Sequence, residues 1–145
     1  MKIGSHNEYI ELIELERLPE GIQCSGDINL QVTVKIKEFQ GSYSGVWLEV
    51  PEMKKFLEEL KALDKSRKGS AKISSTSPEE FILEIRSSDN LGHIEIETQL
   101  HRLQWSGPTY WPILLKGGFE VEPEAISELI LCFKNLTNKQ KLTRN

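Results

Sequence analysis

The sequence predicts an α+β fold in which an antiparallel β-sheet of about seven strands, arranged as a meander, carries two amphipathic helices. Three observations support this prediction. Apolar and polar residues alternate strictly over residues 28–37, which is the pattern of a strand with one buried and one wet face. Apolar residues recur at helical spacing in two later segments, 51–68 and 123–136. Apart from 51–63, the connections between expected strands are short or lack the crossover helix that parallel strands need.

Three strands are expected before the first helix, at 9–16, 28–36 and 46–50. The second of them has the clearest alternation. Phe39 breaks the phase of that alternation, so a bulge is expected near Lys37 or Glu38. Glycine and serine are frequent at 41–45, which predicts a turn before the third strand.

Each predicted helix has an apolar stripe at offsets of 0, 3, 4, 7 and 10 residues. Pro51 and Pro123 are expected to open the helices, at a position where a missing N–H costs nothing. Gly69 is expected to end the first helix. Because each stripe follows a strand that ends in valine, the two stripes suggest a chain of two halves, each a meander followed by a helix. The stripes are Met53, Phe56, Leu57, Leu60 and Leu63, and Ile126, Leu129, Ile130, Phe133 and Leu136.

Four strands are expected between the helices, at 71–73, 81–86, 94–100 and 113–121. The segment from Asp89 to Gly92 is expected to be a hairpin loop, because Asp bonds its own backbone and Asn or Gly adopts positive φ. Turn-forming residues at 104–108 predict a loop before the last strand. Pro112 lies near the start of that strand, where a proline is tolerated.

The length of 145 residues, of which 38% are hydrophobic, is enough to bury a core, so 1–136 is expected to form one α+β domain. The segment 137–145 holds one apolar residue and is expected to be a flexible C-terminal tail. Four side chains of the helices are expected to be buried against the strands: Phe56, Leu60, Ile130 and Phe133.

The net charge of −4 is too small for a disordered acidic chain and has the wrong sign for a nucleic-acid binder. The charge is unevenly distributed, because residues 54–72 carry seven basic and three acidic side chains while the segments on either side are acidic. Such a surface either keeps the protein soluble or attracts a basic protein partner.

A cytoplasmic location without membrane association is expected. The first eight residues lack the apolar stretch of roughly 7–15 residues that a signal peptide needs. The longest apolar run, 129–133, is far shorter than the roughly 20 residues that span a bilayer. Cys24 and Cys132 lie far apart without a CxxC spacing, which favours thiols over a disulfide or a metal site.

No catalytic, cofactor or metal motif is found, so the chain is expected not to be an enzyme. GxGxxG, Walker-type and HExxH patterns are absent from the sequence. The segment 41–45 has Tyr43 at the position where a nucleophile elbow needs serine, and it precedes a strand. His93 and His101 lie on one expected strand about 26 Å apart, which is too far to share one metal ion.

The candidate residues for a protein-binding surface are outward-facing carboxylates and aromatics. The alternation over 94–101 turns four polar side chains outward. Exposed tryptophans near a loop are typical interface anchors. The alternatives are a merely solvated strand face and aromatics that cover a sheet edge. The candidate binding residues are Trp47, Glu95, Glu97, Gln99, His101, Trp105 and Trp111.

A series of short stretches spans 26–136: GDINLQVTV at 26–34, FQG at 39–41, VWL at 46–48, the helix with Phe56, Leu60 and Leu63, GSA at 69–71, SPE at 77–79, Asp89 with Gly92 and His93, and FEV at 119–121. In this order they resemble the WapI-type immunity proteins of bacterial polymorphic toxin systems. The region 105–118 is longer and more aromatic than the family pattern.

The resemblance implies a small cytoplasmic protein that binds and neutralises a cognate toxin domain, with no enzymatic activity and no cofactor. It defines no binding residues, because immunity surfaces vary with the toxin. The charge of the chain favours a basic toxin domain as the partner. The alternatives are an adaptor or structural domain on the same fold and, more remotely, a small-ligand carrier or an unrecognised enzyme. A toxin gene next to this one would favour the first function.

Overall fold

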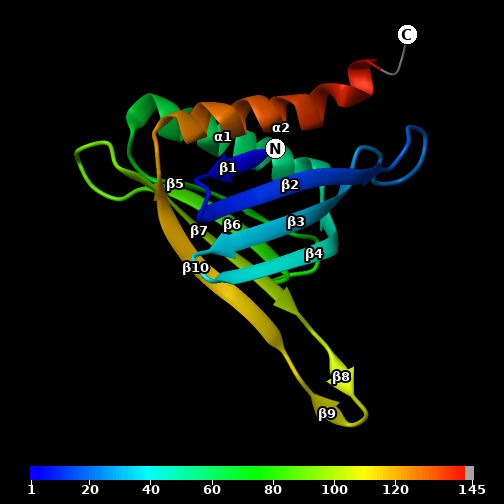
Figure 1. Cartoon of the computed structure of the whole chain (residues 1–145). Helices are drawn as coiled ribbons and strands as arrows, with labels where there is room; N and C mark the ends of the chain where they lie inside the picture. Colours follow the sequence, from blue (N-terminus) through cyan, green and yellow to red (C-terminus); the bar gives the residue numbers. More distant parts are fainter. Residues whose placement is uncertain (143–145) are drawn as a thin grey trace.

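The computed structural model describes residues 1–142, which form two four-stranded antiparallel sheets, a two-stranded hairpin and two helices (Figure 1). The first sheet contains β1 (Lys2–Gly4), β2 (Glu8–Arg17), β3 (Ile28–Ile36) and β4 (Phe39–Leu48), and α1 (Val50–Ser66) follows it. The second sheet contains β5 (Ser70–Ser74), β6 (Phe81–Ser87), β7 (Ile94–Arg102) and β10 (Ile113–Val121), and α2 (Glu124–Leu142) follows it. The small hairpin between β7 and β10 consists of β8 (Trp105–Ser106) and β9 (Thr109–Tyr110).

The predicted α+β class with antiparallel strands and two helices is confirmed. The chain forms ten strands in three sheets, whereas about seven strands in one sheet were expected. The additional strands are the short β1, β8 and β9. Each half of the chain is a four-stranded meander followed by a helix, which is the arrangement that the two similar stripes suggested.

Residues 37–45 do not form the predicted bulge and turn. Lys37 and Glu38 make a two-residue turn, in which Lys37 has a φ of 55° and Ile36 pairs with Phe39. The extra residue lies instead at Gly45 in β4, where the register shifts between Leu30 and Gln31 of β3. Gly45 has a φ of 91°, a conformation that glycine adopts at little cost, so the bulge forms there.

The helix ends differ from the prediction. Arg67, not Gly69, follows α1 in the left-handed conformation, with a φ of 57°, and its N–H donates to the Leu63 carbonyl at 2.8 Å. Gly69, with a φ of 92°, leads into β5. The backbone of α2 is helical as far as Leu142, so the first part of the predicted tail is helical, and 143–145 lie outside the described residues.

One continuous hydrophobic core lies between the two sheets and the two helices. Figure 1 shows both helices lying together along one end of the sheets. Phe56, Leu60 and Phe133 are fully buried as predicted, whereas Ile130 is only partly buried. The rings of Phe56 and Phe133 meet edge to face with centroids 4.9 Å apart, and this contact joins the two halves.

Candidate protein-binding surface

A hairpin arm, residues 103–114, extends the second sheet beyond the core (Figure 1). It consists of β8, β9, the residues that flank them and the first two residues of β10. Trp105 pairs with Tyr110 and Ser106 with Thr109, and Gly107, with a φ of 58°, makes the tip together with a proline. The sequence holds no charged residue from 103 to 115. The arm is therefore an uncharged projection from a negatively charged chain.

The arm exposes an unusual amount of apolar surface. The Trp105 and Tyr110 rings pack on each other with centroids 5.1 Å apart, yet both remain open to water. Several exposed apolar side chains on one projecting segment are more typical of a contact site for another macromolecule than single scattered ones are. The exposed side chains are Leu103 (66%), Trp105 (68%), Tyr110 (40%), Trp111 (57%), Ile113 (53%) and Leu114 (57%).

The base of the arm is held by the first sheet. A Cβ on Gly41 of β4 would lie 3.1 Å from the Leu115 side chain, and a Cβ on Gly117 would lie 2.7 Å from Ile36 of β3. A larger residue at either position would require the Leu115 or Ile36 side chain to move, so the two sheets approach each other closely here. These contacts lie on β10 just beyond the arm, so they fix the strand from which the arm projects.

A second contact at the same place involves Tyr43 of β4. The Arg102 guanidinium lies 5.6 Å from the centroid of the Tyr43 ring. Burial, together with the negative charge of Glu80 and its hydrogen bond to the Tyr43 hydroxyl, raises the pKa of Tyr43. The Glu80 carbonyl accepts a hydrogen bond from the His101 N–H at 2.9 Å. Tyr43 thus connects the first sheet to the strand that enters the arm.

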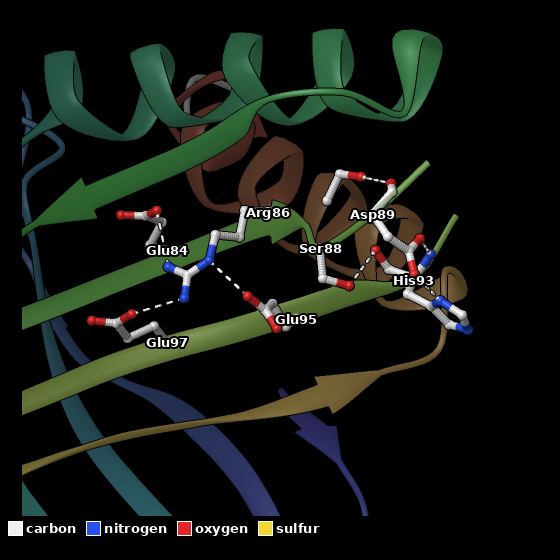
Figure 2. A network of polar contacts seen from close by, with 8 residues as sticks. Glu84, Arg86, Ser88, Asp89, His93, Glu95 and Glu97 are labelled. Carbon is white, nitrogen blue, oxygen red and sulfur yellow. Dashed lines mark hydrogen bonds and ion pairs between the residues drawn. The ribbon is translucent and has the colours of Figure 1, made fainter. Parts of the chain in front are cut away.

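A charged cluster covers the outer face of the second sheet (Figure 2). Arg86 of β6 donates hydrogen bonds to Glu95 at 2.8 Å, to Glu97 at 3.0 Å and to Glu84 at 3.2 Å. Lys116 Nζ lies 3.7 Å from a Glu97 oxygen. The hydrogen bonds with Glu95 and Glu97 raise the pKa of Arg86, and the one from Arg86 lowers the pKa of Glu97. Three carboxylates around one guanidinium leave the cluster negative, but Glu95 and Glu97 are already paired.

Of the residues predicted from sequence, four lie on the arm or at its base. Trp105 and Trp111 belong to the arm itself. Gln99 and His101 lie on β7 directly before it, and the Gln99 amide donates to the Glu79 carbonyl at 2.8 Å. These four residues lie toward the same end of the second sheet, two on the arm and two on the last part of β7.

The other predicted residues lie elsewhere. Glu95 is near the opposite end of β7, about 23 Å from the arm base at the rise of an extended strand, and Glu97 lies between them. Trp47 lies on β4 of the first sheet, opposite Asn29, and is half-buried. The aromatic and acidic residues that the sequence grouped as one set thus fall into separate places.

Sequence reasoning missed several residues of this surface. Ile113 continues the apolar alternation of the predicted strand 113–121, but it is 53% exposed because the sheet extends past the core at that point. Leu103 and Leu114 were likewise not recognised. The signal that could have found them is the run of thirteen uncharged residues, 103–115, in a chain of which 28% is charged.

A second polar network fixes the loop between β6 and β7 (Figure 2). The Asp89 carboxylate accepts hydrogen bonds from the Leu91 and His93 N–H groups and contacts Nδ1 of His93. Nε2 of His93 lies 4.0 Å from Glu120. Hydrogen bonding to Asp89 raises the pKa of His93, and the same bond lowers the pKa of Asp89. The loop predicted at Asp89–Gly92 is confirmed, and the hydrogen bonds accepted by the Asp89 carboxylate hold its turn.

The surface offers little for small-molecule chemistry. A hollow of about 310 Å³ lies over Gly117 and Gly118, but Arg86, Glu97 and Lys116 on its wall are bonded to one another. Among the described residues, no group of three His, Cys, Asp or Glu side chains is placed to hold a metal ion. No helix in the described part of the chain is long and apolar enough to cross a membrane.

Comparison with known proteins gives one match. The model of the immunity protein WapI-like family matches residues 3–139, which is nearly the whole chain. No curated protein and no solved structure is significantly similar to it.

Proposed function

We propose that the chain, which belongs to the WapI-like immunity protein family, neutralises a basic toxin domain in the cytoplasm by binding it through the arm, without catalysing a reaction. Membership of the family indicates a toxin-neutralising role that works by protein binding. The observation that supports the arm as the contact is its set of six exposed large apolar side chains on an uncharged segment.

Covering the arm would release a large apolar area from water. Trp105, Tyr110 and Trp111, each about 150–250 Å² in size and 40–68% exposed, together present roughly 250–400 Å². A stable interface needs about 800 Å² from each partner. The toxin domain therefore also contacts neighbouring surface, for which Gln99 and His101 at the arm base are the nearest predicted residues.

The charged surface has a different role in this proposal. Because Glu95 and Glu97 are paired with Arg86, contacting them would mean breaking existing ion pairs. They act at a distance instead, where negative charge raises the association rate of a basic partner. We therefore expect the dissociation rate to depend on the arm and the salt dependence of association to depend on the acidic surface.

The test is a calorimetric titration with the product of the gene adjacent to this one. Trp105→Ala and Trp111→Ala should each weaken binding by about 30-fold, or about 2 kcal/mol, as truncated interface anchors do. Leu131→Ala is the matched control, because Leu131 is 61% exposed but lies on α2. Unchanged affinity in both tryptophan variants would exclude the arm, and no binding by the native protein would exclude the immunity function.

A further inference from the structure

We propose that the edge of β10 next to the arm binds an extended segment of the toxin domain by strand addition, so that the second sheet gains a strand in the complex. This inference rests on the proposed function and specifies how the partner is held. An edge strand presents unpaired N–H and C=O groups, and natural proteins usually protect such edges. The two large sheets have four edge strands, β1, β4, β5 and β10.

Three of the four edges are protected. β1 is only three residues long. β4 is interrupted by the bulge at Gly45, which breaks the regular spacing of its hydrogen-bonding groups. β5 is five residues long and packs beside α1, from which the Glu59 carboxylate accepts a hydrogen bond from the Lys72 N–H at 3.2 Å.

The edge of β10 lacks these protections. Its nine residues pair with β7 without any register shift. Within residues 1–142, β7 is the strand hydrogen-bonded to it, and β3 and β4 contact it without strand pairing. Lys116 is the one charged residue from 103 to 119, and its ammonium group is directed toward Glu97 of its own sheet. No proline lies within the strand. Every second residue of β10 therefore turns its backbone N–H and C=O groups away from β7, to a side where no strand of the described residues is hydrogen-bonded to them.

Only part of β10 is proposed as the binding edge. Near its end, Glu120 and Val121 line a hollow of about 240 Å³ together with Gly4 and Ser5, so the β1–β2 corner stands close to the strand there. The segment 113–118 lies outside that hollow and continues directly into the arm. An added strand would run along 113–118 and past the arm residues that carry the exposed aromatic rings.

The side chains of this edge indicate the chemistry of the added segment. Ile113 and Leu115 face one side of the sheet, and Leu114 and Lys116 face the other. Three of these four side chains are apolar. The complementary segment is therefore an extended stretch of the toxin domain with apolar residues on both faces, paired by main-chain hydrogen bonds whatever its exact sequence.

Amide hydrogen–deuterium exchange of the protein with and without the product of the adjacent gene tests the inference. In the complex, alternate amides of 113–118 should exchange at least tenfold more slowly, while those of 39–44 on the equivalent edge of β4 should not change. Binding that protects the arm but not 113–118 would overturn strand addition and leave the proposed function intact. Protection that appears in the free protein and rises with its own concentration would assign the edge to a second copy and overturn the inference.

Substitutions at Leu114 provide an independent test. Leu114→Ser and Leu114→Lys both remove the apolar side chain, but only the lysine guards the edge against pairing. The lysine variant should bind the toxin domain about tenfold more weakly than the serine variant, with circular dichroism confirming that both are folded. Equal affinities would contradict the inference, and the tryptophan variants of the arm would still report on the proposed function.

Discussion

The two halves of the molecule share one topology and differ most in their third hairpin. In the first half, two residues join β3 to β4, and in the second half ten residues, 103–112, join β7 to β10. The strand ends match, because Ile36 pairs with Phe39 as Arg102 pairs with Ile113. Two residues are thus enough to close such a hairpin. The arm is an addition to the scaffold that the fold does not require.

The comparison separates the scaffold from the binding surface. Both halves alternate buried apolar residues along their central strands, and their helices meet at Phe56 and Phe133. In the first half, the third hairpin is short and the last strand, β4, contains a bulge. The second half lengthens that hairpin, fills it with exposed apolar side chains and keeps its last strand regular. Features that recur in both halves serve folding, and features confined to the second half are the better candidates for function.

The largest effect is expected where the halves meet. Phe133→Ala should lower the free energy of unfolding by about 3–5 kcal/mol, because it removes a fully buried ring and leaves a cavity against Phe56. Urea denaturation measures the change. Leu131→Ala, an exposed substitution two residues earlier, should change stability by about 0.5 kcal/mol or less. A loss below about 1 kcal/mol for the phenylalanine variant would mean that the halves are not joined through this contact.

Copying the short hairpin into the second half tests the comparison directly. Replacing 103–112 with Lys-Glu, the turn of the first half, should leave the unfolding free energy within about 1 kcal/mol of the native value, because the arm adds little to the core. Binding to the toxin domain should weaken by at least about 100-fold, or about 2.8 kcal/mol. Calorimetry and denaturation of the same sample measure both. A variant that fails to fold would show that the arm belongs to the scaffold.

The charged cluster on the second sheet gives a smaller effect. Glu97→Lys should lower the unfolding free energy by about 1 kcal/mol, because it removes the contacts with Arg86 and Lys116 and places a third positive charge beside them. Glu38→Lys is the matched control, because Glu38 lies in the exposed β3–β4 turn. Equal stability of the two variants, measured by urea denaturation at low salt, would show that the cluster is only a solvated surface.

The charged cluster also shows which features could be predicted from the sequence and which could not. The alternation of Glu95 and Glu97 correctly predicted that both face outward, because that pattern is local. Their pairing with Arg86 depends on the register between β6 and β7, in which Arg86 lies opposite Glu95. A one-residue shift would have turned the side chains apart, and no local pattern fixes that register. The sequence therefore predicted the face but not the interactions on it.

The same limit applies to the elements. The helices and the strand at 28–36 were predictable because their periodicity spans several turns or pleats. The bulge at Gly45 and the arm were not, because each depends on where the sheets meet and end. Ile113 continues an inward alternation but is 53% exposed. A pattern of polarity reports which side a residue faces, and only the packing of other elements decides whether that side is covered.

The smallest effect concerns the β6–β7 loop, whose counterpart in the first half, the β2–β3 connection, contains no histidine. The pKa of His93 is raised, which means that protonation of His93 favours the folded loop. The contribution of His93 to the stability of the loop is therefore complete below the unfolded pKa of about 6.5 and is lost as the pH rises through the folded pKa. The pKa of Asp89 is lowered, so the ionised carboxylate favours the folded loop. The contribution of Asp89 to the stability of the loop is lost as the pH falls through its folded pKa.

The exchange rate of the Leu91 amide, corrected for its intrinsic pH dependence, should therefore rise as the pH increases above about 6.5 and His93 loses its proton. The amide reports on the loop because it donates to the Asp89 carboxylate at 2.7 Å. In His93→Gln the corrected rate should be independent of pH over the same interval. A matching rise in the glutamine variant would mean that another group controls the loop. A flat profile in the native protein would mean that the contact between Asp89 and His93 does not stabilise it.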